Sequence, residues 1–350
     1  MNIRQKQFDY LVVGQGIAGS LISYFLKKEG KRVGVIDEGH GRSASMLAAG
    51  IVNPVTGRNF VCSWRIDEFL PTAIAIYDEL TEHLDIKTYT QTNLIRALHT
   101  TEDENNWLAR TADPKVSEYI LSEANTSEIN GRINPAYAYG ELTGTLQVHL
   151  AEIIKSFAKK WEDEGILIHE RFEYDKLRHH PETGYAYGDL YFNGVIFCEG
   201  YQAERNPFFP EIGMAPAKGE VLYVRIPGAN FSKMYKDKVF IVRLYDDVYW
   251  VGSGYEWNVA DALPTQNGYE ILSKAIDALL TIPYEIIDHR AAIRPTMYKR
   301  RPVLIVHPTY KEMYLFNGLG TKGASIGPFA AKQYANYILY KDPKDLSLDG

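Results

Sequence analysis

The sequence predicts an α/β protein in which a Rossmann-like dinucleotide-binding domain is combined with a second, α+β domain. Three observations predict this class. A strand-like run, a glycine-rich turn and an amphipathic helix follow one another within residues 9–37. Helical and strand-like stretches alternate along the rest of the chain, and a second glycine-rich loop, at residues 316–331, precedes the last helix. A chain of 350 residues is also long enough for two or three domains.

The order of local patterns gives the expected elements. Residues 9–37 contain "DYLVV", "IAGSLISYFLKKEG" and "RVGVID", which are typical of strand, helix and strand, with Gly30 as the helix stop. Residues 66–84 predict a helix that is interrupted at Pro71. The polar, turn-rich stretch from 86 to 140 predicts an inserted lobe. The later elements are expected to be an amphipathic helix over 145–164, strands over 165–174 and 188–200, a strand-rich stretch over 219–256, a helix over 267–281, extended segments over 286–307 and a last helix over 323–340.

Composition and charge exclude several classes of protein. Apolar residues make up 45% of the chain and charged residues 23%, as in ordinary globular proteins, and the 25 tyrosines suit a pocket for a planar ligand. The net charge of −6 indicates no general affinity for polyanions. Cys62 and Cys198 form no metal-binding pattern, so no metal is expected. No signal peptide and no membrane span is recognisable, so we expect a reduced, cytoplasmic protein.

The first glycine-rich turn predicts a site for a dinucleotide. Gly14 permits the tight turn, Gly16 lets the backbone approach a diphosphate, and Gly19 lets the helix pack on the strand. Asp37 ends the next strand, where an acid accepts hydrogen bonds from ribose hydroxyls and repels a 2′-phosphate. This acid argues against NADP, whereas NAD and FAD both remain open. The residues expected to contact the cofactor here are Gly14, Gly16, Ile17, Ala18, Gly19, Asp37 and Glu38.

The loop after Asp37 favours FAD over NAD. It reads "EGHGRSASMLAAGIVNPVTGRN", and its small side chains permit a flat ring to lie against the backbone. An ordinary NAD dehydrogenase does not continue in this way, so NAD is the second choice of cofactor. The loop residues expected to contact FAD are Ser43, Ser45, Ala48, Ala49 and Gly50.

Several later motifs follow in an order that is typical of one family. They are "GTLQVHLAEIIKSFAKKWEDEGILIHE", "GVIFCEGY", "APAKGEVLYV", "YWVGSGYEW", "AAIRPTMYKRRPVLIV" and "FNGLGTKGASIGP". Together with the small-residue loop, they make the chain resemble the D-amino-acid oxidase and glycine oxidase family of FAD-dependent oxidoreductases. The resemblance covers most of the chain. The chain is also similar to the oxidase domain of the bifunctional enzyme that modifies a wobble uridine in tRNA.

This resemblance implies both an architecture and a cofactor. The fold would be a Rossmann-like FAD-binding domain of the glutathione-reductase type, with an interleaved substrate domain built on a mixed or antiparallel sheet. FAD would be bound non-covalently. The segments expected for the FAD-binding domain are 1–83, 143–213 and 290–345, and those expected for the substrate domain are 84–142 and 214–289.

In the family, the second glycine-rich loop faces the pyrimidine end of the flavin ring. Helix amides and the ammonium of Lys322 would then stabilise the negative charge of the reduced flavin. A solvated loop lysine is the alternative for Lys322. The resemblance implies FAD contacts at Gly200, Gly318, Gly320, Thr321, Lys322 and Gly323.

On the substrate side, the family transfers a hydride from an amine-bearing carbon to flavin N5, so we expect no protein nucleophile. Arg294, in "IRPT", matches the arginine that pairs with the substrate carboxylate. Phe240 lies where glycine oxidase has an active-site tyrosine, so a hydrogen bond to substrate is lost there. Tyr255 falls where a residue of the pocket wall is expected. The predicted substrate is a small amine or amino acid.

Three consecutive basic residues, Lys299 to Arg301, depart from the family pattern. A solvated basic turn is the simplest interpretation. A more anionic substrate, or a modified base in tRNA, is the alternative, and a flavin-binding protein without its own turnover is a third hypothesis. The sequence leaves the electron acceptor and the oligomeric state open.

Overall fold

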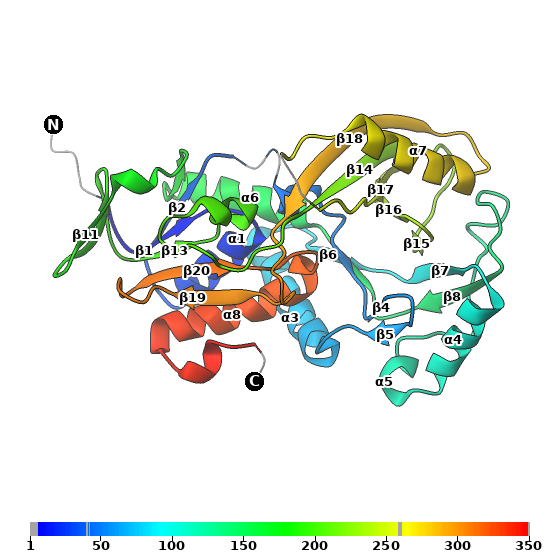
Figure 1. Ribbon diagram of the computed structural model, residues 1–350, viewed down its shortest axis with the longest axis horizontal. Coiled ribbons are helices and arrows are strands. Elements are labelled where there is room, and N and C mark those ends of the chain that lie inside the picture. The colour runs from blue at the N-terminus through cyan, green and yellow to red at the C-terminus, as the bar shows by residue number, and fades with distance from the viewer. Residues whose placement is uncertain (1–5, 40, 42, 258–260, 349–350) are drawn as a thin grey trace.

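The computed structural model describes residues 6–39, 41, 43–257 and 261–348. Two large sheets lie side by side along the longest axis of the molecule (Figure 1). The first has eight strands: β1 (Lys6–Val13), β2 (Val33–Asp37), β10 (Leu167–His169), β11 (Leu177–His180), β12 (Gly184–Tyr187), β13 (Leu190–Phe197), β19 (Val303–Val306) and β20 (Met313–Asn317). The second has seven: β7 (Leu94–Leu98), β8 (Ala138–Leu142), β14 (Ala217–Arg225), β15 (Met234–Lys236), β16 (Phe240–Tyr245), β17 (Val248–Gly252) and β18 (Glu285–Arg294).

Two small sheets and the helices complete the described structure. The small sheets consist of β3 (Ile51–Val52), β6 (Tyr89–Gln91) and β9 (Leu146–Val148), and of β4 (Val55–Thr56) with β5 (Val61–Cys62). The α-helices are α1 (Ile17–Lys28), α2 (Ala44–Leu47), α3 (Ile66–Leu84), α4 (Thr101–Thr111), α5 (Pro114–Ser117), α6 (Leu150–Asp163), α7 (Gln266–Leu279) and α8 (Gly323–Tyr340). The 3-10 turns are η1 (Tyr174–Lys176), η2 (Gly200–Arg205) and η3 (Pro343–Asp345).

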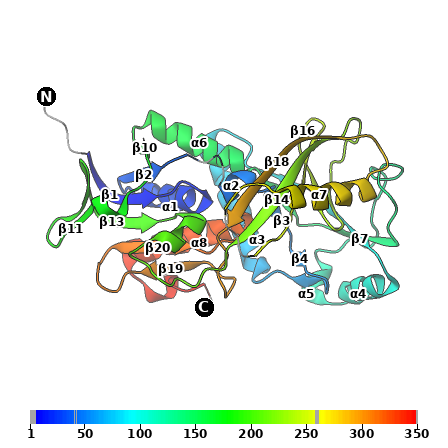
Figure 2. The ribbon, with the colours of Figure 1, turned by 45° about the horizontal axis from the view of Figure 1, so that its top comes forward.

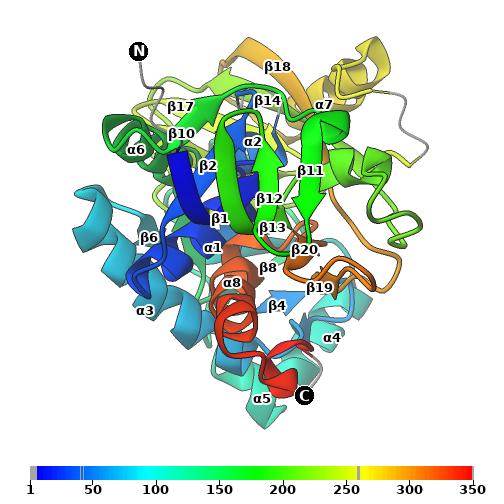
Figure 3. The same ribbon diagram turned by 90° about the vertical axis from the view of Figure 1, so that its left-hand side faces the viewer.

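The eight-stranded sheet has the parallel centre that the glycine-rich turn predicts. β1 pairs in parallel with β2 and β13, and β20 pairs in parallel with β13. Successive residues of β1 enter opposite cores, since Val12 packs on one face of the sheet and Leu11 and Val13 on the other. In Figure 3, α1, α3 and α8 lie on one side of this sheet. The predicted α/β class and the Rossmann-like start are confirmed.

The two ends of the chain meet through α1 and α8. The small residues at the start of α8 allow the helices to approach closely, since a Cβ at Gly323 would lie 3.3 Å from Ile17 Cγ2. The close packing of these helices brings both glycine-rich loops to one place. Helix α1 ends at Lys28, and Gly30 follows it with φ of +76°, as the sequence predicts.

The seven-stranded sheet is mixed, because β15 pairs in parallel with β7 and the other pairs are antiparallel. α7 packs on β14 and β17. β18 runs from this sheet toward the centre of the molecule and ends there at Arg294 (Figure 2). The predicted division into two domains stays a prediction: β18 spans its boundary at residue 290 and pairs with β14 along its length.

Three local expectations were wrong in detail. The amphipathic helix begins at Leu150 rather than at 145, because residues 146–148 form β9 between β3 and β6. The strand expected over 165–174 shortens to residues 167–169 of β10. Helix α3 continues through Pro71 without interruption. In the first two cases pairing with distant strands decides the bounds, and a local pattern does not contain those partners.

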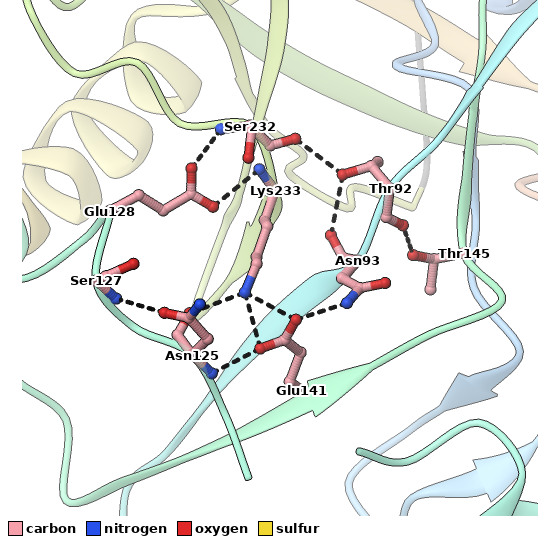
Figure 4. Close-up of polar contacts among 9 residues, drawn as sticks. All are labelled: Thr92, Asn93, Asn125, Ser127, Glu128, Glu141, Thr145, Ser232 and Lys233. Carbon is pink, nitrogen blue, oxygen red and sulfur yellow. Dashed lines mark hydrogen bonds and ion pairs between the residues drawn. The ribbon is translucent and has the colours of Figure 1, made fainter.

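A buried ion pair holds part of the seven-stranded sheet together (Figure 4). Glu141 on β8 is 1% exposed, and its carboxylate oxygens lie 2.8 and 2.9 Å from Lys233 Nζ, just before β15. Glu141 also accepts hydrogen bonds from Asn93 Nδ2 at 2.6 Å and from the Asn125 amide at 2.7 Å. Glu128 accepts from the amides of residues 232 and 233. The network therefore ties β8, β15 and the loop at 125–128 to one another.

Candidate active site

A cavity of about 1200 Å³ lies between the two large sheets. One part of its wall is formed at the carboxyl ends of β1, β2 and β13 of the first sheet. Another part is formed by β14, β16, β17 and β18 of the second sheet. Ligands bind in open α/β sheets at this edge of the strands, and typical small-molecule pockets measure about 300–1,000 Å³. The cavity is therefore large enough for an elongated cofactor with a substrate beside it.

The first glycine-rich turn has the geometry of a diphosphate-binding turn. Gly14 has φ of +96°, and a Cβ there would lie 2.6 Å from the Cys198 carbonyl oxygen. Gly16 lines the cavity, and its nearest neighbour is Ser45 Oγ, which accepts the Ile17 amide at 3.1 Å. Gly16 and Ile17 stand at the N-terminal end of α1, where the positive end of the helix dipole favours an anion.

Two predicted glycines serve packing rather than the cavity wall. Gly19 does not line the cavity, and a Cβ there would lie 1.8 Å from the Gly14 carbonyl oxygen. Gly318 is also absent from the wall. A Cβ there would lie 2.5 Å from Met297 Cγ, so the lack of a side chain makes room for Met297. Both residues shape a loop that forms the wall, and neither faces the space inside.

The acids at the end of β2 lie where the sequence predicts them. Asp37 and Glu38 both line the cavity. Asp37 Oδ2 accepts the Gln15 amide at 2.6 Å and its Oδ1 accepts the Gly39 amide at 2.7 Å, so this carboxylate also holds the glycine-rich turn in shape. Gln202 Nε2 donates to Glu38 Oε1 at 3.1 Å. A carboxylate oxygen can accept more than one hydrogen bond, which is the property that the predicted contact with a ribose hydroxyl requires.

The small-residue loop lines the cavity throughout. Ser43 caps α2 by accepting the Met46 amide at 3.2 Å. A Cβ at Gly50, where φ is +71°, would lie 1.8 Å from the Val148 carbonyl oxygen, so only glycine fits beside β9. The predicted loop residues that line the cavity are Ser43, Ser45, Ala48, Ala49 and Gly50.

The second glycine-rich loop also forms part of the cavity wall. Gly320, Thr321, Lys322 and Gly323 line the cavity, and so does Gly200, whose carbonyl accepts Asn317 Nδ2 at 2.7 Å. Lys322 is half-buried, and its Nζ donates to Ser63 Oγ at 3.0 Å. Burial, with a smaller effect of the nearby Arg301, lowers the pKa of Lys322 below its ordinary value. Lys322 therefore faces the cavity rather than solvent, and its contact with FAD stays a prediction.

The wall that the second sheet contributes is almost entirely neutral. We call it the second-sheet wall, and its described residues are Gly219, Val221, Phe240, Trp250, Ser253, Ala292, Ile293, Arg294 and Pro295. Gly219 and Val221 face the cavity, whereas Glu220 between them faces α7, where it accepts hydrogen bonds from Thr265. Arg294 is the one charged member of this set of described residues.

Arg294 is held in place by contacts on several sides. Its Nη2 donates to Ser253 Oγ at 2.5 Å and to the Gly254 carbonyl at 3.2 Å. A Cβ at Gly219 would lie 2.0 Å from this Nη2, so the absence of a side chain there makes room for the guanidinium. The Tyr255 ring lies 5.0 Å from Arg294 Cζ. The guanidinium therefore has one fixed position in the wall.

The charge of Arg294 has no counterion within the described chain. Its Nη1 is buried without a hydrogen-bond partner there, and no described carboxylate forms an ion pair with it. Burial lowers the pKa of Arg294 below its ordinary value, although Tyr255 opposes this. Guanidinium groups nevertheless stay protonated in proteins. An unpaired buried cation beside an open cavity is a site for an anion.

The other two predicted substrate residues differ in position. Phe240 lines the cavity, with Lys236 Nζ 4.8 Å from its ring centroid. Tyr255 does not line the cavity, is 49% exposed, and contacts Arg294 from the outside. The sequence analysis missed Trp250, whose Nε1 donates to the Leu47 carbonyl at 2.9 Å and so joins the second sheet to α2. Gly219 and Ser253 were also not predicted, although they lie inside the motifs "PAKGEV" and "VGSGYEW".

The basic run next to Arg294 divides into two parts. Tyr298, 77% exposed, is followed by exposed Lys299 and Arg300, as a solvated turn predicts. Arg301 instead lies 3.8 Å from the centroid of the Trp64 ring. None of the run lines the cavity. The expectation of a wholly solvated turn therefore holds for Lys299 and Arg300 and fails for Arg301.

These residues fit FAD and give no sign of a metal. Gly16 lines the cavity without a side chain, and a Cβ there would meet only Ser45 Oγ at 3.4 Å, so a diphosphate can approach the start of α1. In the described part of the chain, no group of three or more His, Cys, Asp or Glu residues could hold a metal ion. None of the described helices is both long and apolar enough to cross a membrane.

Fold and site thus define a flavin-dependent oxidoreductase, and comparison with known proteins gives the family. Residues 9–337 match the DAO family, described as FAD dependent oxidoreductase. The chain belongs to this family, and it is therefore an FAD-dependent oxidoreductase.

Known relatives align with the chain from end to end. It is 25% identical over 368 residues to glycine oxidase of Bacillus subtilis (strain 168), which covers 97% of this chain and 95% of that protein. The crystal structure of glycine oxidase from Geobacillus kaustophilus superposes with a TM-score of 0.82 at 20% identity, covering 98% of this chain and 99% of that one. Iminodiacetate oxidase from Chelativorans sp. BNC1 gives 0.79 at 19% identity, covering 95% and 96%. The structural likenesses show the fold.

Proposed function

We propose that this protein oxidises the C–N bond of a small amine that carries a carboxylate, such as an amino acid or an N-substituted amino acid. The observation that carries the proposal is the unpaired Nη1 of Arg294 in an otherwise neutral wall. The names of its relatives, glycine oxidase and iminodiacetate oxidase, support the same class of substrate.

The position of Arg294 favours a carboxylate over other anions. A guanidinium is planar and pairs with a carboxylate through two parallel hydrogen bonds. The Nη2 hydrogen bond to Ser253 and the space at Gly219 fix the plane of the group before a substrate arrives. Less entropy is therefore lost when the substrate binds. The substrate's carboxylate would be anchored at Arg294, with its amine-bearing carbon directed into the cavity.

FAD, which we propose is held non-covalently, would supply a hydride acceptor for the amine-bearing carbon when bound. The chain's own residues then position and enclose the substrate. Val221, Ala292 and Trp250 provide an apolar surface that excludes water around the reacting carbon. Lys322 would add positive charge to the cavity wall at the second glycine-rich loop. In this scheme no protein side chain acts as a nucleophile.

The test is a screen of flavin reduction without oxygen. Purified holoprotein is mixed anaerobically with matched pairs of compounds, namely glycine with methylamine, and N-methylglycine with dimethylamine. Bleaching of the flavin absorbance is expected for at least one carboxylate-bearing amine and much more slowly for its partner. Iminodiacetate and glycolate extend the screen to a dicarboxylate and to a hydroxy acid. The proposal fails if no amine reduces the flavin, or if methylamine and glycine reduce it equally well.

The other hypotheses stay predictions. A modified tRNA base as substrate would need an RNA-binding surface, and the exposed Lys299 and Arg300 are the only members of the basic run that such a surface could use. Filter binding to tRNA over a range of salt concentrations tests it. The hypothesis of a flavin protein without turnover is tested by the same anaerobic screen. Acid precipitation that leaves all flavin in the supernatant would support non-covalent binding.

A further inference from the structure

Glu199 lies beside the first glycine-rich turn, in the part of the cavity wall expected to face the cofactor's diphosphate. It lies two residues beyond Phe197, the last residue of β13, and lines the cavity. A Cβ at Gly14 would lie 3.4 Å from the Glu199 Cα, so Glu199 lies against the first glycine-rich turn. The cofactor therefore brings its negatively charged diphosphate to the edge of the sheet where Glu199 begins.

Glu199 has donors around it but no cation. Tyr174 OH donates to Glu199 Oε1 at 2.6 Å, and Asn206 Nδ2 donates to Oε2 at 2.8 Å. No described cation forms an ion pair with it. Arg171 and Arg205 line the same cavity and act electrostatically on Tyr174, and Cys198, which follows β13, is the neighbouring titratable group in the chain. The carboxyl group is thus positioned by hydrogen bonds, and no described cation balances its charge when it is ionised.

An ionised Glu199 and the diphosphate would repel each other across a cavity from which the cofactor excludes water. We propose that Glu199 is a cofactor-binding residue that is protonated when FAD is bound, so that binding takes up one proton from solvent and weakens as the pH rises. In its neutral form the carboxyl group can also donate a hydrogen bond, which the ionised form cannot do. This inference concerns the cofactor, and it does not depend on which substrate is oxidised.

The protonation equilibrium of the free site agrees with this geometry. Burial raises the pKa of Glu199 to about 7, although the hydrogen bonds from Tyr174 and Asn206 act in the opposite direction. A nearby diphosphate raises it further. Since the proton binds more tightly when FAD is present, FAD must bind more tightly when the proton is present. Affinity is therefore highest below pH 7 and falls above it.

The experiment measures release of FAD from the holoprotein. Holoprotein is diluted in buffers from pH 6 to pH 8.5, and free FAD is followed by its fluorescence at equilibrium. For the wild-type protein we expect the dissociation constant to rise by as much as about 30-fold over this range, the value for complete exclusion of the ionised form with a pKa near 7. In Glu199→Gln, which is permanently neutral, the dissociation constant should be nearly constant over the same range.

Two further variants separate this proposal from a structural effect. Tyr174→Phe removes a donor that stabilises the ionised carboxylate, so the fall in affinity should begin at a higher pH than in the wild type. Glu173→Gln changes an exposed acid of the same wall, which pairs with Lys176 at 2.5 Å, and should keep the wild-type profile. A flat wild-type profile, or a Glu199→Gln profile as steep as that of the wild type, would overturn the proposal.

Discussion

Lys233 and Arg294 are two cations of the second sheet with opposite surroundings. Lys233 directs Nζ to both oxygens of Glu141, at 2.8 and 2.9 Å, and to the Asn125 carbonyl at 2.9 Å, so its three donors are all used (Figure 4). Arg294 donates through Nη2 to Ser253 and Gly254, whereas its Nη1 is buried without a described partner. The first charge is neutralised inside the fold, and the second has no described counterion.

The difference shows how burial of charge separates structure from function. A buried ion pair with all its hydrogen bonds satisfied needs nothing from outside, although it is costly to break. A buried cation without its anion reduces the stability of the free protein. A fold that retains such a group must recover the free energy when an anion binds. Substitutions at the two residues should therefore affect different properties of the protein.

The largest expected effect is on stability, at the neutralised site. Lys233→Met leaves the Glu141 carboxylate, 1% exposed, without its cation, and should lower the free energy of unfolding by about 3–5 kcal/mol. Urea unfolding of the holoprotein, followed by circular dichroism, measures this. The kinetics of flavin reduction should be unchanged at temperatures where the variant is folded. A loss below about 1 kcal/mol would show that the network is not an important source of stability.

Arg294→Met should impair flavin reduction by the substrate and leave the stability of the protein nearly unchanged. The free energy of unfolding should stay within about 1 kcal/mol of the wild-type value, because the variant removes a buried charge that has no described counterion. The second-order rate constant for flavin reduction by a carboxylate-bearing amine should fall roughly 30- to several thousand-fold, equivalent to about 2–5 kcal/mol. Stopped-flow reduction and urea unfolding measure the two quantities. Severe destabilisation with unaltered substrate binding would reverse the assignment of the two cations.

A smaller effect on catalysis is expected from a substitution at Gly219, which makes room for the Arg294 guanidinium. In Gly219→Ala the new Cβ would lie 2.0 Å from Arg294 Nη2, so the side chain must move. We expect the KM for a carboxylate-bearing amine to rise about 10- to 100-fold, with a smaller change in kcat and no change in FAD affinity. Gly41→Ala is the matched control, since nothing lies within 4 Å of a Cβ there. Equal effects of both variants would contradict a positioning role for Gly219.

The smallest effect is the pH dependence of the ion pair. Burial opposes ionisation of Glu141, but the hydrogen bonds from Lys233, Asn93 and Asn125 outweigh it and hold its pKa below the usual value. The pair therefore stabilises the protein fully above about pH 4.5, and this contribution is lost as the pH falls through the lowered pKa. Below pH 4.5 the wild type should lose up to about 1.4 kcal/mol per pH unit more than Glu141→Gln. Parallel curves from pH 6 to pH 3 would refute this assignment.

Part of the candidate site could be predicted because its signal is local. The spacing of Gly14, Gly16 and Gly19 and the acid at Asp37 belong to one continuous segment, and both features adopt the expected conformations. The sequence predicted that Gly19 lets the helix pack on the strand, but it could not tell that neither Gly19 nor Gly318 lines the cavity. A glycine needed for close packing and one needed for ligand approach look the same in a sequence.

The substrate wall and the ion pair could be predicted only in part. Arg294 was found through its motif, but Ser253 and Gly219, which hold it, come from other strands. Glu141 and Lys233 are 92 residues apart and meet only because β7 joins β8 to β15. Whether a buried charge has a partner therefore depends on which distant segments the strand pairing brings together.

By itself, the sequence determined the α/β class, the helices at both ends of the chain and the turn for a dinucleotide, because these depend on apolar periodicity and on glycines within short segments. Only the tertiary structure decided that the two glycine-rich loops border one cavity, that Lys233 is neutralised and that Arg294 is not. The reason is physical: backbone preferences act between neighbours in the chain, whereas the free energy of a charge depends on every group folded around it.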